Sequence, residues 1–497
     1  MAGIKSLAKD TVVYGLSSII GKFLNWCLVP LYTHMFTETE YGVVTYLYSL
    51  VALLLTMLTY GMETGFFRFA NHEKYNDPIK VYTTALISLA STSILFLLAV
   101  VLFIEPITSI LGNSGDPRYI LMLAATLSID AFTALPFAYL RYKSRPVRFA
   151  GIKLLSIFLN IGLNLFFIVL CPQIHKIHPE WVSWCYDATF GVGYIFLSNL
   201  IASLVTLIVL IPEIFGVRYR FDKEIWHKMI SYSFPLLIMG LAGIMNQTID
   251  KLIYPMLVPD TERAMTELGI YGANYKIAIV MVMFIQAFRF AYEPFIFAKN
   301  RNRGEDKKAA YVEAMHYFII FALFIFLGVM FFLPVLKYFI APAYFVGLAV
   351  VPIVMAGEFF FGIFFNLSLW YKLTDRTYWG TWLSLLGLIV TLAINIAFVP
   401  HYGYMACAWA AFCCYLTMMI VSYLLGRKYY PLPYKWKAAL RYTVLAALLY
   451  TIAMVVPTWD LVWTLLFRSI LLLAYIVYVI RYDMPLREWP VIGKYFK

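Results

Sequence analysis

The chain alternates between long apolar stretches and short polar breaks along almost its whole length. A helix needs about 20 mostly apolar residues to cross roughly 30 Å of hydrocarbon, and the apolar stretches reach this length. No polar stretch is long enough to form a soluble domain. We therefore predict an all-α polytopic membrane protein with about fourteen transmembrane helices, at residues 11–35, 41–69, 81–104, 118–140, 149–171, 188–212, 232–257, 268–298, 311–333, 344–371, 377–399, 402–426, 438–457 and 461–481.

Composition supports a membrane protein. Hydrophobic residues make up 62% of the chain, charged residues make up 13%, and the mean hydropathy is +0.78, whereas soluble domains average about 25% charged residues. The first apolar stretch contains Lys22 and is too long for a signal-peptide core, so we expect it to be retained as a span. The net charge of +12 does not indicate nucleic-acid binding, because no basic run is interleaved with aromatic residues.

The positions of the cations predict the orientation. Lys and Arg in short loops concentrate on the cytoplasmic side of a membrane. With the N-terminus inside, the inner segments hold 27 cations and the outer segments hold four, Arg118, Lys176, Arg263 and Lys337. A missed or invented span would scramble this alternation. The charges therefore favour fourteen spans with both termini in the cytoplasm.

An internal repeat divides the spans into two related halves. The first span ends at Pro30 and leads to Tyr41-Gly42, and the seventh ends at Pro255 and leads to Tyr271-Gly272. Spans five and eleven also share asparagines and a terminal proline: Asn160, Asn164 and Pro172 in one, Asn395 and Pro400 in the other. We expect two pseudo-symmetric six-helix lobes, at 1–220 and 221–428, followed at 429–497 by two C-terminal helices and a cytoplasmic tail. Paired six-helix halves are typical of transporters, whose substrate site lies between them near the midplane.

Charged residues fall inside the predicted spans, and we single out nine of them. One charge at the bilayer centre costs about 2.5–3.5 kcal/mol, so six facing lipid would cost roughly 15–20 kcal/mol, more than the about 5–15 kcal/mol by which proteins are stable. We therefore expect most of them to face a water-filled cavity or to pair with one another. They are Lys22, Glu63, Asp130, Asp250, Lys251, Lys276, Arg289, Glu293 and Glu358.

Some of these charges have local explanations. Arg68, near the inner end of its span, can extend its guanidinium into the interface. Arg289 and Glu293 are four residues apart and can form an ion pair on one helix face. Asp250 and Lys251 are consecutive, about 100° apart on a helix, so we expect them not to form one patch. The remaining cations suit a phosphate-bearing or otherwise anionic substrate, and the carboxylates could bind a coupling H⁺ or Na⁺ or only pair with the cations.

Signals for enzyme chemistry are weak. Cys171, His175, His178 and Cys185 in the longest outer loop have irregular spacing for a zinc site, and we assign no catalytic residue, metal or cofactor. A Cys171–Cys185 disulfide and two unlinked thiols remain open alternatives. A membrane-embedded polysaccharide polymerase or acyltransferase would normally expose acidic or histidine residues on a substantial loop, which the short outer segments lack. No Gly-rich phosphate loop ending in Gly-Lys-Ser/Thr is present.

Several motifs, in order along the chain, are similar to one family. They are Val13-Tyr14-Gly15, Gly21-Lys22, Pro30-Leu31-Tyr32-Thr33, Glu40-Tyr41-Gly42, Tyr60-Gly61-Met62-Glu63, Asp250-Lys251, Gly272-Ala273-Asn274-Tyr275-Lys276 and Pro400-His401-Tyr402-Gly403. The chain resembles, over its whole length, the bacterial polysaccharide transporters, which are O-antigen and capsule oligosaccharide flippases of the multidrug/oligosaccharidyl-lipid/polysaccharide exporter superfamily. The connection from Pro172 to Phe190 is longer than this pattern expects.

The resemblance implies a function in the bacterial inner membrane. Two lobes would alternate in access and carry an undecaprenyl-pyrophosphate-linked oligosaccharide to the outer leaflet, with a polysaccharide polymerase and a chain-length regulator as possible partners. A lipid II flippase and a cation-coupled multidrug exporter are alternatives, although fourteen spans and the buried cations disfavour the exporter. The substrate-binding candidates are Lys22, Arg68, Lys251, Lys276 and Arg289, and the ion-coupling candidates are Asp130, Glu358, Glu63, Asp250 and Glu293.

Overall fold

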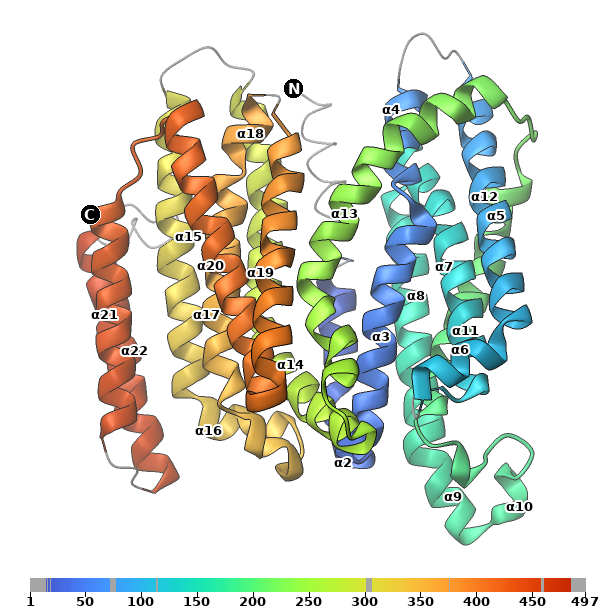
Figure 1. Cartoon of the computed structure of the whole chain (residues 1–497), viewed down its shortest axis with the longest axis horizontal. Coiled ribbons are helices and arrows are strands. Elements are labelled where there is room, and N and C mark those ends of the chain that lie inside the picture. Colours follow the sequence, from blue (N-terminus) through green and yellow to red (C-terminus); the bar gives the residue numbers. More distant parts are fainter. Residues whose placement is uncertain are drawn as a thin grey trace. The chain divides into compact units, whose positions relative to one another are not determined.

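A computed structural model describes residues 15, 17, 19–71, 77–112, 115–300, 306–374, 376–456 and 460–483, without the side chains of 291, 293–300, 306 and 307. The described residues form helices and connecting turns, with no strand (Figure 1). The chain divides into two compact units. Unit 1 comprises Met1–Gly272 and Leu388–Cys407, and unit 2 comprises Ala273–Gly387 and Ala408–Lys497.

Unit 1 consists of the helices of the first half of the chain, together with parts of three later ones. Residues 19–26 are helical and lead into α2. The first turns of α14 (Thr261–Asn300), the end of α19 (Tyr378–Tyr402) and the start of α20 (Tyr404–Tyr429) also belong to this unit. Its other helices are α2 (Val29–Met35), α3 (Glu38–Thr59), α4 (Met62–Ala70), α5 (Pro78–Leu102), α6 (Ile104–Leu111), α7 (Pro117–Tyr142), α8 (Pro146–Asn164), the π-helix η2 (Leu165–Leu170), α9 (Cys171–Ile177), α10 (Pro179–Val182), α11 (Gly193–Val209), α12 (Ile211–Phe215) and α13 (Lys223–Leu257).

Polar residues fix where several of these helices begin. Thr37 and Glu40 form a capping box at the start of α3, which satisfies backbone N–H groups that have no partner within the helix. Asp222 caps α13 by accepting from the N–H groups of Glu224 and Ile225, so α13 begins before the predicted start at residue 232. Hydrogen bonds from Lys80 and from these amides lower the pKa of Asp222.

The predicted span 41–69 is divided in two. Tyr60 (φ 31°) and Gly61 (φ 69°) adopt left-handed conformations between α3 and α4. Glycine reaches this region readily, whereas a side chain there is disfavoured. The break separates α3 from α4, which carries Glu63 and Arg68.

Glycines bring α3 and the first turns of α14 into close contact. A Cβ atom on Gly42 would lie 1.8 Å from the Met265 carbonyl oxygen, and one on Gly269 would lie 1.9 Å from that of Glu38. A Thr39–Thr266 hydroxyl hydrogen bond of 2.7 Å lies beside this contact. The repeat motif Tyr41-Gly42 therefore lies against the turns of α14 that precede Tyr271-Gly272, at positions where only glycine fits.

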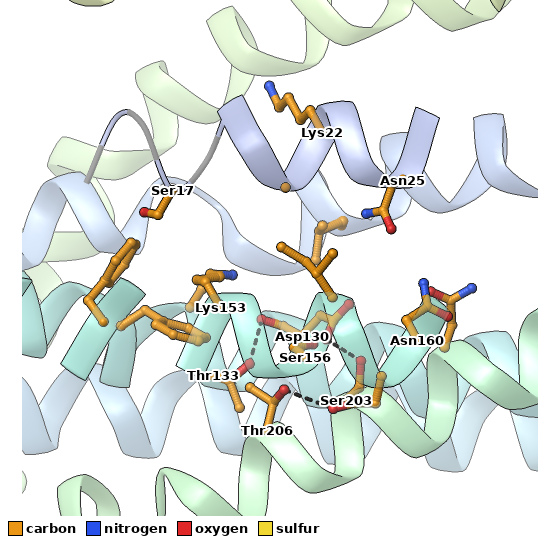
Figure 2. Close-up of a pocket in the computed structure, with 18 of the residues that line it drawn as sticks. Ser17, Lys22, Asn25, Asp130, Thr133, Lys153, Ser156, Asn160, Ser203 and Thr206 are labelled. Atoms are coloured by element: carbon orange, nitrogen blue, oxygen red, sulfur yellow. Dashed lines mark hydrogen bonds between the residues drawn. The ribbon is translucent and has the colours of Figure 1, made fainter. Parts of the chain in front are cut away.

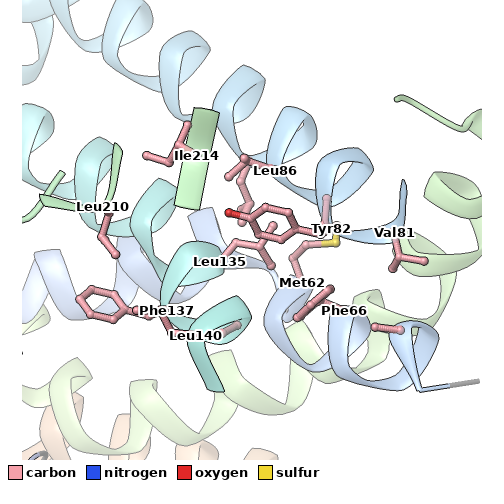
Figure 3. Close-up of a cluster of buried hydrophobic side chains, with 14 of the residues drawn as sticks. Met62, Phe66, Val81, Tyr82, Leu86, Leu135, Phe137, Leu140, Leu210 and Ile214 are labelled. Atoms are coloured by element: carbon pink, nitrogen blue, oxygen red, sulfur yellow. The ribbon is translucent and has the colours of Figure 1, made fainter. Parts of the chain in front are cut away.

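A buried hydrophobic cluster joins α4, α5, α7, α8, α12 and α13. Phe66 and Tyr82 lie at its centre, with ring centroids 5.8 Å apart, and Phe137 packs edge-on against Phe149. Figure 3 shows Phe66, Tyr82 and Phe137 with their neighbours from these helices. The cluster fixes the C-terminal half of α7 and the start of α8, which also contribute to the site described below.

Unit 2 contains most of α14 and the later helices. They are α15 (Asp306–Phe331), α16 (Leu333–Leu336), α17 (Val350–Leu367), α18 (Leu369–Leu373), the remaining parts of α19 and α20, α21 (Trp436–Val455) and α22 (Leu461–Tyr482). The buried Arg468 of α22 donates to the carbonyls of Phe331 (3.3 Å) and Ala453 (3.4 Å). These carbonyls lie at the C-terminal ends of α15 and α21, where a cation is favourable. Arg468 therefore ties the last two helices to α15.

Twelve helices among the described residues are long and apolar enough to cross a membrane. The shorter apolar helix α11 and the predicted first span, whose beginning lies outside the described residues, account for the other two expected spans. The prediction of an all-α, multi-pass membrane protein is confirmed. The division at residues 220 and 428 stays a prediction.

Candidate functional site

A polar cavity of about 690 Å³ lies within unit 1. Its wall is formed by residues 17–25, α3, α4, α7, α8 and α11, and Figure 2 shows many of its side chains. Cations, carboxylates, hydroxyls and amides line it among helices that are otherwise apolar. Its polar residues are Ser17, Lys22, Asn25, Thr56, Thr59, Glu63, Asp130, Thr133, Arg141, Lys153, Ser156, Asn160, Asn199, Ser203 and Thr206.

Helical spacing brings these residues onto the cavity wall. Residues three and four apart share one face of a helix. Lys153, Ser156 and Asn160 follow this spacing along α8, and Asn199, Ser203 and Thr206 follow it along α11. The cavity therefore results from polar stripes on neighbouring helices.

The carboxylates of the cavity have protein partners. Ser203 donates a 2.7 Å hydrogen bond to Asp130 Oδ1. Glu63 forms an ion pair with Arg141, whose guanidinium also lies 5.2 Å from the ring centroid of Phe67. Arg141 and Glu63 thus offset each other's charge.

Lys153 is held differently. Its Nζ lies 4.0 Å from the centroid of the Phe137 ring, an arrangement in which the ring attracts the cation without neutralising it. Within the described part of the chain, no carboxylate lies within ion-pair distance of this ammonium group. Lys153 therefore presents a positive charge to the cavity that an anionic ligand can neutralise.

The structure brings together only some of the residues predicted from the sequence. Lys22, Glu63 and Asp130 line the cavity. Arg68 is exposed at the other end of α4, with its guanidinium 4.1 Å above the Tyr232 ring, and does not line the cavity.

Other candidates belong to unit 2. Glu358 is buried on α17 and accepts a 2.8 Å hydrogen bond from the Tyr275 hydroxyl. Arg289 lies 5.0 Å from the centroid of the Phe365 ring, and Lys276 is half-buried on α14. The side chain of Glu293, and with it the expected ion pair with Arg289, lies outside the described residues.

Asp250 and Lys251 correct one expectation. The two residues were predicted to face apart, but Lys251 Nζ donates to both carboxylate oxygens of Asp250, at 3.1 and 3.2 Å. The long lysine side chain reverses along the helix and also donates to the Gln247 carbonyl at 2.9 Å. The Tyr271 hydroxyl donates a 2.7 Å bond to Asp250. The pair is buried and does not line the cavity.

Removing the lysine from this buried pair should destabilise the protein. Lys251→Met leaves the buried Asp250 carboxylate without its cation, while the Tyr271 hydrogen bond remains, so we expect a loss of roughly 3–5 kcal/mol. The thermal unfolding midpoint of the purified protein measures this effect. The Asp250→Asn/Lys251→Met double variant should regain most of the loss. If Lys251→Met left the midpoint unchanged, the ion pair would have no structural role.

Sequence reasoning missed Lys153 and Arg141. Lys153 lies inside the predicted span 149–171, so the same energetic argument that singled out Lys22 applies to it. Arg141 was assigned to the inner loop because it follows the predicted end of its span. Its position on the cavity wall depends on α7 continuing to Tyr142, which apolar composition does not indicate.

Two cysteines of the longest predicted outer loop, Cys171 and Cys185, are thiols in this structure. Cys171 is buried and Cys185 is half-buried, and they are not linked by a disulfide. Among the described residues, no group of three or more His, Cys, Asp or Glu side chains is placed to hold a metal ion.

Comparison with known proteins identifies the family. Residues 7–300 match the model of a family described as polysaccharide biosynthesis protein. Because the match covers more than half of the 497 residues, the chain belongs to this family. A search of curated protein sequences finds no significant match.

Solved structures with the same fold are membrane transporters. A lipid II flippase MurJ, in an inward closed conformation, matches with a TM-score of 0.72 and 12% identity over 95% of this chain and 98% of its own. An inward-facing multidrug resistance MATE transporter of the MOP superfamily matches with a TM-score of 0.67 and 14% identity, over 84% of this chain and 97% of its own. At these identities the comparison establishes the fold.

Proposed function

We propose that the protein is a flippase that moves a lipid-linked oligosaccharide repeat unit from the cytoplasmic to the outer leaflet for polysaccharide biosynthesis. Transport by alternating access requires no covalent chemistry, and we assign the protein no enzymatic activity. The observation that carries the proposal is the polar cavity of about 690 Å³ inside the membrane-spanning helices of a polysaccharide biosynthesis protein. Ionisable side chains within membrane-spanning helices are costly and mark substrate or ion pathways or pair with one another.

The charges in the cavity favour an anionic substrate over a cationic one. Three cations, Lys22, Arg141 and Lys153, and two carboxylates, Glu63 and Asp130, line the cavity, so its formal charge is +1. Glu63 is paired with Arg141, and Lys153 lies beside the Phe137 ring without an ion pair in the described part of the chain. Undecaprenyl pyrophosphate supplies the matching negative charge. A multidrug exporter of cationic compounds would need a cavity in which negative charges exceed positive ones.

A lipid II flippase is the second candidate. The MurJ match extends over 95% of the chain, compared with 84% for the MATE transporter. Lipid II is also a pyrophosphate-linked saccharide, so the cavity argument does not separate it from a polysaccharide repeat unit. The family match favours the polysaccharide repeat unit.

Deletion of the gene in its host separates these functions. For an oligosaccharide flippase, we expect loss of surface polysaccharide and accumulation of complete lipid-linked repeat units on the cytoplasmic face. A lipid II flippase would instead give arrested cell-wall synthesis, and a polymerase would give flipped, unpolymerised units. An acyltransferase would give chemically incomplete units. Normal surface polysaccharide in the deletion strain would contradict the proposal.

The proposed orientation places both termini in the cytoplasm of a bacterial cell, in the inner membrane. A single cysteine at Arg145, in a variant without the six native cysteines, should react with an impermeant maleimide only after the membrane is opened. If the maleimide reacted with this cysteine in intact cells, the loop would lie outside the cell and the proposed orientation would be wrong. A polymerase and a chain-length regulator are the proposed partners.

Asp130 is our first candidate for a coupling H⁺ or Na⁺ because it is the carboxylate of the cavity that is held by a hydroxyl, Ser203, rather than by a cation. Transport in vesicles with an imposed ion gradient tests this role. We expect Asp130→Asn to make transport insensitive to the gradient, and an unchanged gradient dependence would exclude Asp130.

A further inference from the structure

The two ends of the cavity differ in chemistry. Lys153 lies at one end, and Asn160 and Asn25 lie at the other (Figure 2). Lys153 and Asn160 are seven residues apart on α8, which corresponds to about 10 Å along a helix. The Glu63–Arg141 pair lies at the end of α7 that packs near the start of α8. Three of the five charged groups that line the cavity, Lys153, Glu63 and Arg141, therefore lie at one end, and the Asn25 and Asn160 amides lie at the other.

Hydrogen bonds fix which atoms of Asn160 face the cavity. The Tyr32 hydroxyl donates to Asn164 Oδ1 at 2.9 Å. Asn164 Nδ2 in turn donates to Asn160 Oδ1 at 2.9 Å. The amide oxygen of Asn160 is thus occupied, and its NH₂ group makes no hydrogen bond within the described part of the chain. Asn160 presents a donor.

Asn199 has the opposite arrangement. Its Nδ2 donates to the Ile195 carbonyl at 2.9 Å and to the Tyr48 hydroxyl, so both of its amide protons are used. Its Oδ1 accepts no hydrogen bond from any described residue. Asn199 presents an acceptor on α11, which packs against α8.

The Asn160 and Asn199 side chains lie toward the same end of the cavity. The Phe167 ring, in the continuation of α8, stacks on Tyr194 near the start of α11, with centroids 4.9 Å apart. The end of α8 therefore lies beside the start of α11. Asn160 lies seven residues before Phe167 on α8, and Asn199 lies five residues after Tyr194 on α11. The two asparagines are therefore at similar distances from this end.

A sugar hydroxyl both donates and accepts hydrogen bonds, so neutral donors and acceptors in one place match it, whereas a phosphate requires donors or cations. We propose that Asn160 and Asn199 form a sugar-binding subsite, with the phosphates of the same lipid-linked molecule held near Lys153. This inference rests on the proposed function and adds the order in which the substrate lies along the cavity. The separation of about 10 Å along α8 places the two sites at different positions along one substrate molecule.

Two probes distinguish the sugar subsite from the phosphate end. The purified full-length protein is titrated with sugar-free undecaprenyl pyrophosphate and with the lipid-linked repeat unit extracted from the host. Asn160→Ala and Asn199→Ala should each weaken binding of the glycosylated lipid about tenfold, the effect of losing a buried hydrogen bond, and leave the sugar-free lipid unaffected. Lys153→Gln should weaken binding of both lipids.

Folding of the variants is controlled separately. Asn160→Ala removes one of the two acceptors of the buried Asn164 amide and leaves the Asn160 carbonyl. Asn199→Ala removes no acceptor that another described residue uses, so it must reproduce the selective loss. Asn71→Ala, at the exposed end of α4, should change neither affinity. Equal weakening of both lipids, or no change with either, would overturn the subsite. Failure of the wild-type protein to bind either lipid would instead reject the proposed function.

Discussion

Replacing Lys153 with glutamate should abolish transport of the lipid-linked substrate while leaving the protein in the membrane. Lys153 is the cavity cation held by an aromatic ring, Phe137, rather than by an ion pair in the described part of the chain. Reversal of its charge would place a carboxylate near Asp130 and repel the substrate phosphates. We expect at least a hundredfold loss of transport rate, because attraction of a few kcal/mol becomes repulsion in a site of low dielectric.

Lys143→Glu is the matched control for this charge reversal. Lys143 follows the end of α7, is exposed, and does not line the cavity. The Lys143→Glu variant should retain near-normal transport, and the abundance of the Lys143→Glu and Lys153→Glu proteins in the membrane should be equal. A Lys153→Glu protein that transports at the wild-type rate would remove Lys153 from the substrate path.

Gly42→Ala should strongly destabilise unit 1. The added methyl group would lie 1.8 Å from the Met265 carbonyl oxygen, and a backbone atom cannot move aside as a flexible side chain can. Overpacking usually costs 1–3 kcal/mol, and a direct backbone collision on this scale should exceed about 4 kcal/mol or force α3 and α14 apart. Thermal unfolding of the purified protein measures the loss.

The same substitution elsewhere provides the control. Gly243 lies in α13, and a Cβ atom there would meet nothing within 4 Å. Gly243→Ala should therefore be neutral or stabilising by up to about 1 kcal/mol, because alanine is the better helix former. Equal unfolding midpoints for Gly42→Ala and Gly243→Ala would show that the close contact does not constrain the helices.

The fold was largely predictable because membrane insertion imposes a pattern that is read directly from apolar length and from cation placement. The residues at which helices begin and end were harder to predict from the sequence. The break at Tyr60–Gly61 occurs inside one continuous apolar stretch, and α13 begins at Lys223 because of the Asp222 cap, well before its apolar part. Backbone conformation and capping, rather than hydropathy, decide these boundaries.

The site was predictable only in part. The cost of burying charge drew attention to Lys22, Glu63 and Asp130, which line one cavity, and their roles stay predictions. That cost does not say whether a charge faces a cavity or a partner, so Asp250 and Lys251 were expected to point apart although they form an ion pair. The roles of Asn160 and Asn199 depend on which amide atoms Asn164 and Tyr48 occupy. No sequence pattern contains that information.

Movement of the lipid-linked oligosaccharide across a bilayer tests the central claim most directly. Vesicles are loaded with the host's lipid-linked repeat unit in the inner leaflet only, and a lectin outside detects sugars that reach the outer leaflet. Vesicles containing the wild-type protein should expose the sugars with time, whereas protein-free vesicles and vesicles containing Lys153→Glu should not. Exposure at the same rate in all three preparations would contradict the claim that this protein carries the substrate through its cavity.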